Sequence, residues 1–491
     1  MSSNNAINLS SIQQTSHVNQ LSLATLGKSI AISGLVLFLF YTLMYNHPYK
    51  PSSDIFTPFI EQKWPSNSPY NVTNPPTNIS HIMFVLAGSI KTWNYRKPYI
   101  EAWWRPNRTR GNLWLDVAPT EYLLPWSPSS PPFRINEDVT QLKNIHSKMV
   151  DPIQVRMYRS ILETFKLGEN KDVRWYVMAD DDSLIFIDNL VEMLGRYDHN
   201  KYYYIGKNSE CVHSNFQFSF DMGYGGAGYA LSYALVEVLA SNIDGCIERY
   251  QHLITSDYMS QSCLADLGVD LTIEMGLHQI DLVGDISGLL SAHPKAPLIS
   301  LHHFDTINPI FPSKNQSESI NHLMEAANID QSRLLQQTIC YYRPSNWTFS
   351  ISWGYSAHVY ESILPRSILR KPLETFKPWQ KVRPPFFMFT TRWPSDDPCQ
   401  APHVFFLETI QNNDRDNLVL TSYVRSSPRN LRACSSNANH SGEPVSRIRV
   451  FSPATARKEY GKIECCDVEY VPGNDTADVK LRACMKGEML A

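Results

Sequence analysis

Short uninterrupted apolar runs alternate with amphipathic segments along the first two thirds of the 491-residue chain. Runs of this kind, bounded by glycine or polar residues, predict buried strands at residues 81–87, 112–116 and 174–179. Segments whose apolar residues recur every three or four positions predict helices at residues 92–104, 152–165 and 186–194. This alternation predicts an α/β fold with a mostly parallel, twisted sheet flanked by helices. Ligands of such folds bind beyond the carboxyl ends of the strands.

The pattern changes near residue 378, which sets the predicted domain boundary. Residues 81–378 form the predicted α/β domain, and residues 379–491 form a separate accessory region. Proline punctuates the start of this region, and short alternating runs such as 404–410 and 446–451 predict strands. Five of the nine cysteines lie in it, at Cys399, Cys434, Cys465, Cys466 and Cys484. We therefore expect the accessory region to be mainly β and to be braced by disulfides.

The N-terminal segment predicts how the chain is anchored. Residues 1–28 are rich in Ser, Asn and Gln and are expected to form a disordered cytoplasmic tail. Residues 29–46 are uncharged and mostly apolar, and counted from Leu26 the stretch reaches roughly the 20 residues of a transmembrane helix. A cleaved signal peptide is the alternative, because the strongest apolar run is short. Residues 47–80, rich in Pro, Ser and Asn, predict an extended stem, so we predict a single-pass type II membrane protein with a lumenal body.

Sequons and cysteines agree with a lumenal body. Seven Asn-X-Ser/Thr sequons follow the apolar segment, at Asn71, Asn78, Asn107, Asn315, Asn346, Asn439 and Asn474. Nine cysteines suit an oxidising compartment, and the odd number leaves one thiol that is free or links two chains in a homo- or hetero-oligomer. No Cys-X-X-Cys pair occurs, which argues against a zinc site. The net charge of −3 gives no basic stripe, so nucleic acid is not an expected partner.

Three consecutive carboxylates follow the predicted strand at 174–179, namely Asp180, Asp181 and Asp182. No cationic residue neighbours them in the sequence, so the cluster is expected either to bind a divalent cation or to be exposed. Oxygen ligands of this kind suit Mn²⁺ or Mg²⁺ shared with a phosphate group. The alternative is an acidic turn that caps the following helix, because the helix dipole favours Asp near a helix N-terminus.

Three further motifs lie downstream of the acids. The stretch Gly223-Tyr-Gly-Gly-Ala-Gly228 has four glycines in six residues, which either let the backbone approach a ligand or form a flexible turn. It lacks the Gly-Lys-Ser/Thr ending of a phosphate-binding loop. Asp257 lies at the start of a predicted helix, where it is a candidate N-cap. His302 and His303 follow an apolar strand, and imidazole is a suitable further ligand for a metal held by carboxylates.

Taken in order, W-Y-V-M-A-D-D-D-S, G-G-A-G-Y-A-L-S, S-D-Y and L-H-H-F-D resemble the motifs of the fringe-like β-1,3-glycosyltransferases (glycosyltransferase family 31 type), and most closely the plant fringe-related branch. The resemblance covers about residues 78–310, and the motifs I-R-V and C-C-D-V-E-Y near the C-terminus are similar to the same branch. It implies a GT-A-type fold for residues 81–378, placement in the Golgi membrane, a UDP-sugar donor and Mn²⁺ or Mg²⁺. The implied reaction moves a hexose with inversion to a hydroxyl of a glycan or glycoprotein, forming a β-1,3 linkage.

The resemblance also implies roles for the acids and the histidines. It makes Asp182 the principal metal ligand and Asp180 a further ligand. It makes Asp180 and Asp181 contacts of the donor. A histidine from the later strand completes the metal site, and either His302 or His303 fits this role.

The remaining implied roles concern the glycine loop and the base. Gly225, Gly226 and Gly228 would line the cleft for donor and acceptor. Asp257 would take the proton of the acceptor hydroxyl as general base. Fringe-like enzymes tend to have an acid pair at this point, whereas this chain has Asp257-Tyr258. The second hypothesis is therefore a catalytically weak or inactive lumenal protein on the same fold that binds glycans or partners another transferase.

Overall fold

The computed structural model describes residues 75–141, 151–413, 417–435, 441–455 and 464–488, together with Gly34, Leu35, Leu37 and Phe38. The chain divides into two compact units, Met1–Pro75 and Pro76–Ala491. The four described residues of the predicted anchor at 29–46 are helical; the rest of the anchor, the tail at 1–28 and the stem up to residue 74 lie outside the described residues. Within the described part of the chain, none of the helices has the length and apolar character needed to cross a membrane.

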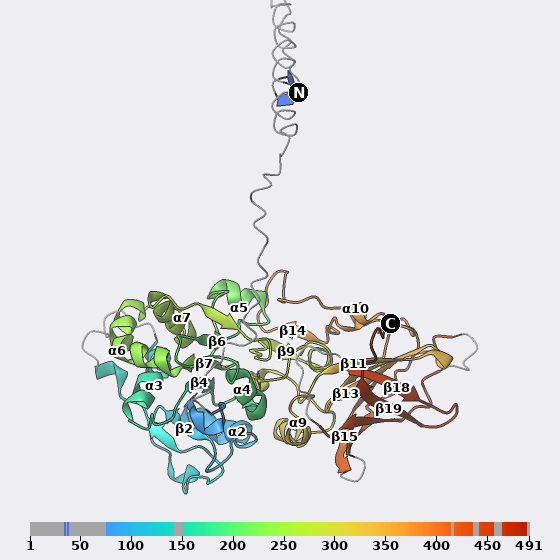
Figure 1. Cartoon of the computed structure of the whole chain (residues 1–491), viewed down its shortest axis with the longest axis horizontal. Coiled ribbons are helices and arrows are strands. Elements are labelled where there is room, and N and C mark those ends of the chain that lie inside the picture. Colours follow the sequence, from blue (N-terminus) through green and yellow to red (C-terminus); the bar gives the residue numbers. More distant parts are fainter. Residues whose placement is uncertain are drawn as a thin grey trace, which may run out of the picture. The chain divides into compact units, whose positions relative to one another are not determined.

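The α/β part of the second unit is built on a seven-stranded sheet (Figure 1). Its strands lie in the order β3 (Phe133–Ile135), β2 (Arg110–Leu115), β1 (Ile82–Ala87), β4 (Trp175–Asp180), β7 (Tyr229–Ser232), β6 (Tyr204–Gly206) and β8 (Leu271–Ile273). The pairs β2–β3, β1–β2, β1–β4 and β6–β8 are parallel, whereas β7 runs antiparallel to both of its neighbours. The sheet is therefore mixed, and the three strands predicted from apolar runs are β2, β1 and β4.

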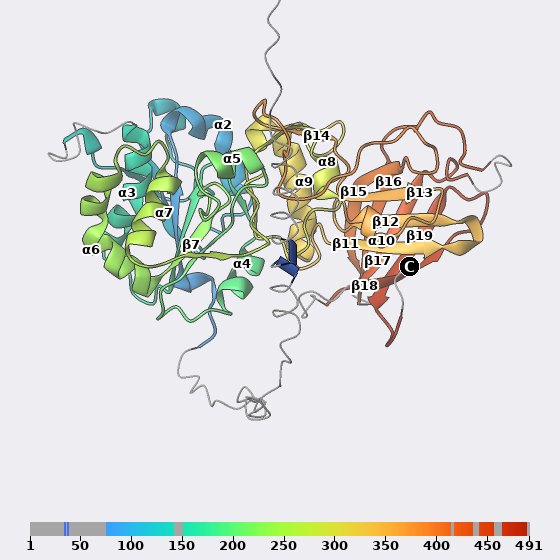
Figure 2. The same cartoon turned by 90° about the horizontal axis from the view of Figure 1, so that it is seen from above.

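Helices cover both faces of this sheet, which explains why its strands read as continuous apolar runs. On one face, α3 (Pro152–Lys166), α6 (Tyr233–Tyr250) and α7 (Ser256–Asp266) share a core with every second residue of β1 and β4. On the other face, α2 (Ile90–Glu101) and α4 (Ile187–Leu194) share a core with the alternate residues of the same strands. Figure 2 shows α3, α6 and α7 grouped on the side of the sheet that faces away from the C-terminal strands.

A second sheet of eight strands occupies the C-terminal part of the unit. Its strands lie in the order β11 (Gln337–Tyr342), β12 (Trp347–Ser352), β13 (Ser356–Tyr360), β15 (His403–Asn413), β16 (Leu418–Arg425), β17 (Arg447–Pro453), β19 (Thr476–Ala483) and β18 (Glu464–Glu469). Neighbouring strands are antiparallel except β17 and β19. The C-terminal region is thus rich in sheet, as predicted. The sheet itself starts before residue 379, because β11, β12 and β13 belong to it.

One hydrophobic core joins the two sheets. Buried side chains of β1, β4 and α4 are continuous with those of α9 (Gln316–Ile329) and of the second sheet, including Phe349, Trp353 and Phe405. The strands of the second sheet are therefore packed as part of the same compact unit as the α/β part. The shorter elements are η1 (Ile79–His81), η2 (Glu121–Leu123), η3 (Val139–Gln141), β5 (Leu184–Ile185), α5 (Val212–Gln217), β9 (Leu282–Gly284), α8 (Ser287–Leu290), β10 (Ser300–Leu301), η4 (Phe304–Thr306), η5 (Arg343–Ser345), α10 (Arg366–Leu369) and β14 (Phe376–Pro378).

Four disulfides use eight of the nine cysteines, and they are Cys246–Cys263, Cys340–Cys466, Cys399–Cys434 and Cys465–Cys484. The bridge from Cys466 leaves the predicted accessory region and reaches β11. The remaining thiol, Cys211, is buried. A link to another chain through the odd cysteine, which the sequence left open, would therefore require local opening of the fold.

Removing the bridge Cys340–Cys466 should cost more stability than removing Cys246–Cys263. The first joins residues 126 apart and the second joins residues 17 apart. Loop-closure entropy in the unfolded chain then predicts a difference of about 2 kcal/mol in the free energy of unfolding. Guanidinium titrations of the paired alanine variants C340A/C466A and C246A/C263A measure this difference. Equal losses, or a larger loss for the shorter loop, would contradict the entropic explanation.

Candidate functional site

The three acids lie in the turn after β4, at the carboxyl end of that strand. β4 ends at Asp180, and β5 begins at Leu184. The hydroxyl of Ser183 accepts the backbone N–H of Asp180 at 3.0 Å and donates to the carbonyl of Gly226 at 2.7 Å. This side chain therefore fixes the acids against the glycine-rich loop. The acids do not cap the following helix, which was the alternative interpretation. The N-cap residue of α4 is Phe186, and no side chain forms a capping hydrogen bond there.

Asp181 is held by α2. Its carboxylate accepts the hydroxyl of Thr92 at 2.7 Å and pairs with the Arg96 guanidinium at 2.7 Å. The residue is buried, and these partners occupy both of its oxygens. Asp181 thus connects the turn after β4 to α2, and the donor contact implied for it stays a prediction. No residue next to the acids in the sequence is cationic, and Arg96 of α2 provides the positive charge beside them.

Asp180, Asp182 and His302 come together in space. His302 follows β10, which pairs with β5, and its Nε2 lies 3.0 Å from Asp182 Oδ1 and 3.6 Å from Asp180 Oδ2. Arg96 lies 3.1 Å from the other oxygen of Asp182. Burial acts to raise the pKa of Asp182, but His302 and Arg96 outweigh it and hold this pKa well below its usual range. Burial and the nearby charge of Asp182 instead raise the pKa of Asp180 well above its usual range.

His303 packs against the His302 ring, with 3.9 Å between ring centroids, but its nitrogen pairs with a different carboxylate. Its Nδ1 is 2.9 Å from Asp281 Oδ1, and its ring stacks on Trp379 with 4.9 Å between ring centroids. Burial acts to raise the pKa of Asp281, but His303 outweighs it and the pKa is lowered. The two predicted histidines thus have different carboxylate partners, and the ligand atoms of His302 are the ones grouped with those of Asp180 and Asp182.

Glycine is required in the loop because other side chains approach its backbone closely. A Cβ on Gly226 would lie 2.0 Å from the His302 ring, and a Cβ on Gly225 would lie 2.5 Å from the Asp257 carboxylate. Gly228 has a φ of +85°, in the left-handed region that favours glycine. Of the two interpretations of the loop, close approach of the backbone is the one that these distances support.

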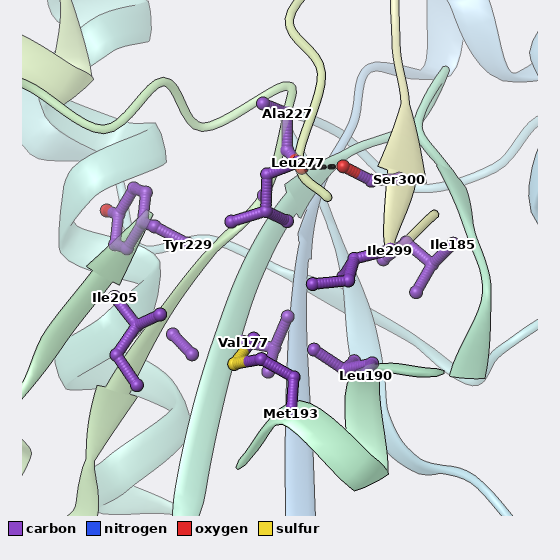
Figure 3. Close-up of a pocket in the computed structure, with 12 residues that line it drawn as sticks. Val177, Ile185, Leu190, Met193, Ile205, Ala227, Tyr229, Leu277, Ile299 and Ser300 are labelled. Carbon is purple, nitrogen blue, oxygen red and sulfur yellow. Dashed lines mark hydrogen bonds between the residues drawn. The ribbon is translucent and has the colours of Figure 1, made fainter. Parts of the chain in front are cut away.

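Apolar side chains around a small pocket lie behind the glycine-rich loop (Figure 3). Val177, Ile205, Leu277 and Ile299 surround this pocket, next to Ala227 of the loop. The hydroxyl of Ser300 donates a hydrogen bond to the carbonyl of Ala227. Packing and hydrogen bonding therefore fix the loop from behind, so that its glycines give close approach rather than mobility.

Asp257 lies in the first turn of α7 next to Gly225. The N-cap of this helix is Thr255, whose hydroxyl accepts the N–H of Tyr258 at 3.2 Å, so the cap does not use the Asp257 carboxylate. Burial raises the pKa of Asp257 to about 6. Tyr258 packs toward Phe218, with ring centroids 6.5 Å apart. An apolar contact thus occupies the position where the resemblance expects a second acid.

A cavity of about 300 Å³ brings these groups together. Its walls include five of the predicted site residues, Asp180, Gly226, Asp257, His302 and His303. Asp182 contacts His302 from outside this lining, and Asp181, Gly225 and Gly228 also lie outside it. The cavity is thus bounded by a carboxylate–histidine group, a half-buried carboxylate of raised pKa and a rigid glycine loop.

Gly226→Ala should displace His302 from Asp182 and destabilise the fold. The added methyl would overlap the imidazole, and such overpacking typically costs about 1–3 kcal/mol. Gly245→Ala is the matched control, because Gly245 lies within α6 with open space around its Cβ position. The control should gain about 0.5–1 kcal/mol from helix propensity. Chemical denaturation measures both effects, and an unchanged free energy of unfolding in Gly226→Ala would contradict this account.

These features define an α/β protein with a carboxylate–histidine site beside a glycine-rich loop. The chain belongs to the family described as "Protein of unknown function, DUF604", which matches residues 214–466. The match includes the glycine loop, Asp257 and both histidines, and it begins after the three acids. A search of curated proteins gave no significant match.

Among solved structures, the chain is similar to a glycosyltransferase involved in the glycosylation of the major capsid of PBCV-1. The sequence identity is 11%, and the alignment covers 50% of this chain and 98% of that chain. The TM-score is 0.25, which is too low for the similarity to support a statement about the fold or activity of this chain.

Sequence patterns did not reveal three residues of the site. Arg96 reaches the acids from 85 positions upstream, and it carries no motif of its own. Asp281 lies between Asp257 and the two histidines, in a segment without a recognisable motif. Trp379 is one of 11 tryptophans, and only its contact with His303 distinguishes it.

Proposed function

We propose that the protein is a metal-dependent inverting glycosyltransferase that moves a hexose from a UDP-sugar to a glycan or glycoprotein hydroxyl, forming a β-1,3 linkage. The observation that carries the proposal is the grouping of Asp180, Asp182 and His302, whose ligand atoms lie within 4.8 Å of one another beside the cavity that Asp257 lines. The order of motifs that resembles fringe-like enzymes supports the same activity. The linkage, the UDP-sugar and the GT-A-type fold rest on that resemblance.

The chemistry of this group fits a divalent cation. Two carboxylate oxygens and one imidazole nitrogen are ligands that Mn²⁺ accepts. Arg96 pairs with Asp181, Asp182 and Asp305, so one guanidinium faces three carboxylates before Asp180 is counted. This excess of negative charge favours a bound divalent cation. When bound, the cation would neutralise the charge that develops on the UDP leaving group.

Asp257 is the proposed general base. Inversion requires a carboxylate that removes the proton of the acceptor hydroxyl as the oxygen attacks the anomeric carbon. Asp257 lines the same cavity as Asp180, and a pKa of about 6 leaves it ionised yet basic near neutral pH. Its neighbour Tyr258 packs in an apolar contact, so the mechanism assigns the proton transfer to Asp257 alone.

The direct test is release of UDP from UDP-galactose, UDP-glucose and UDP-N-acetylglucosamine, with and without Mn²⁺, in the presence of glycan acceptors. We expect turnover with at least one donor and its loss on addition of a chelator. Turnover that is insensitive to the chelator would refute the metal mechanism. No turnover with any donor and acceptor would favour the alternative of a glycan-binding or partner protein.

We further propose that residues 76–491 lie in the Golgi lumen, behind an anchor at residues 29–46. Five sequons fall on described residues, and the asparagine of each is exposed: Asn78, Asn107, Asn315, Asn346 and Asn474. Four disulfides also suit an oxidising compartment. Treatment of the chain expressed in eukaryotic cells with an N-glycosidase should increase its mobility on a gel, and an unchanged mobility would contradict the lumenal placement.

A further inference from the structure

Strand pairing brings Trp379 to the cavity. β14 ends at Pro378 and pairs antiparallel with β9, so that Pro378 lies opposite Leu282. The next residues on each strand, Trp379 and Asp281, continue this pairing, because the N–H of Trp379 donates to the carbonyl of Asp281 at 3.2 Å. This backbone hydrogen bond holds Trp379 at the cavity wall.

The Trp379 ring is stacked on His303, and the residue remains partly accessible. Its plane lies 19° from that of the His303 ring, at 4.9 Å between centroids. The residue nevertheless remains 42% exposed and lines the cavity. An exposed indole that is held in place by a stacked neighbour offers a flat, rigid surface at little cost in conformational entropy.

Backbone strain is concentrated behind this ring. Ile280, Asp281 and His303 have φ values of 72°, 51° and 61°, a left-handed conformation that is rare outside glycine. Two side chains hold the first two residues in place. Glu210 accepts the N–H of Ile280 at 2.7 Å, and Ser209 donates to the Asp281 carboxylate at 2.5 Å. Strain of this kind persists where the surrounding structure fixes it, typically at ligand-binding sites.

A buried ionic cluster anchors Glu210 itself. Lys207 Nζ lies 3.0 Å from its Oε1, and His278 Nδ1 lies 2.9 Å from the same oxygen. His293 adds its ring at 3.8 Å. The Lys207 ammonium already balances the negative charge of the Glu210 carboxylate. The cluster therefore stabilises the cavity wall and is not a second metal site.

The rest of the cavity wall suits an uncharged polyol. Four of its lining residues are glutamines, Gln154, Gln217, Gln279 and Gln380. Each amide both donates and accepts hydrogen bonds, as do sugar hydroxyls. The Gln279 amide already binds the Ala227 N–H and the Asp281 carboxylate, and the Gln154 oxygen accepts the Ser256 N–H. Asp257 lines the same cavity, so a sugar held against Trp379 would lie within the space that the proposed base faces.

We infer that Trp379 is the stacking platform for a pyranose ring of the acceptor, a neutral β-hexopyranoside. The C–H face of such a ring is apolar and weakly positive, and it matches the negative face of an indole. The amides of Gln217 and Gln380, which line the same cavity, would bind its hydroxyls. The assignment of this sugar as acceptor rests on the proposed function, whereas the binding of a pyranoside at Trp379 can be tested without it.

The test measures binding of methyl β-D-galactopyranoside, methyl β-D-glucopyranoside and methyl N-acetyl-β-D-glucosaminide to the full chain by saturation-transfer NMR. Trp379→Ala should weaken the binding of at least one glycoside by about tenfold, which corresponds to about 1.4 kcal/mol. Trp379→Phe keeps a flat ring and should stay within about threefold of the original affinity. Trp393→Ala is the matched control, because Trp393 is 73% exposed and does not line the cavity.

Unchanged affinity in Trp379→Ala, an equal loss in Trp393→Ala, or binding of none of the three glycosides would each overturn the inference. A thermal shift with UDP and Mn²⁺ separates this result from the proposed function. Stabilisation by UDP and Mn²⁺ in both the original chain and Trp379→Ala, with glycoside binding lost only in the variant, supports both assignments. Trp379-dependent glycoside binding without any stabilisation by UDP and Mn²⁺ would retain the pyranoside site and count against the transferase.

Discussion

Asp257→Asn should lower the rate of sugar transfer by about 10²–10⁴-fold, the usual contribution of a general base. The amide keeps the shape of the side chain but cannot accept the proton of the acceptor hydroxyl. Binding of the nucleotide sugar should be retained, because Asp257 is not among the proposed metal ligands Asp180, Asp182 and His302. Steady-state kinetics and a UDP–Mn²⁺ thermal shift on the same protein measure the two effects. Asp270→Asn is the control, since Asp270 is exposed.

The pH dependence gives an independent check on this residue. Burial raises the pKa of Asp257 to about 6, so the original chain should lose activity as the pH falls through this value and the carboxylate is protonated. A pKa raised above that of the unfolded chain also means that the ionised group destabilises the fold at high pH. The stability difference between the original chain and Asp257→Asn should therefore favour the variant more at pH 8 than at pH 4. An acidic limb that persists in residual Asp257→Asn activity would assign the titration to another group.

Asp182→Asn should abolish metal-dependent transfer, with a loss of about 10³-fold or more, because it removes the charge of the principal proposed ligand. The change also removes one of the three carboxylate partners of Arg96 and the nearest carboxylate of His302. The loss of a buried charge partner typically costs about 3–5 kcal/mol. Mn²⁺ titration and urea denaturation should therefore both respond. The exposed Asp396→Asn is the matched control.

The outcome of this substitution discriminates between two roles of the acid. Transfer that survives in Asp182→Asn would show that the metal is held elsewhere. Lost stability with unchanged Mn²⁺ affinity would make Asp182 a structural partner of Arg96 and His302 only. Lost Mn²⁺ affinity in a folded variant supports the ligand role.

Local patterns were sufficient to predict the elements on which the site is built. The apolar runs at 81–87 and 174–179 are continuous because both faces of the sheet are covered, and they became β1 and β4. Helix periodicity at 152–165 likewise predicted α3 within one residue at its end. The turn after β4 carries the acids at the strand end, where the alternation of strands and helices predicts ligand binding.

The site itself depends on contacts between distant segments, which local patterns do not contain. The choice between His302 and His303 was open because adjacent residues differ only in the direction of their side chains. A left-handed backbone at His303 sends its ring to Asp281 and leaves His302 with Asp182. The sequence pattern placed Trp379 at the start of the accessory region. Its position at the cavity depends on the pairing of β14 with β9, which joins segments nearly one hundred residues apart and leaves no local signal.

The start of the second sheet at Gln337 has a consequence for how the protein can be divided. A chain shortened after residue 378 would keep β11, β12 and β13 but lose β15, the partner of β13. The fragment would present the unpaired N–H and C=O groups of a strand that is buried in the whole chain to other chains. It would also lack the indole at position 379. The smallest soluble piece of this protein that retains its cavity is therefore expected to extend through both sheets.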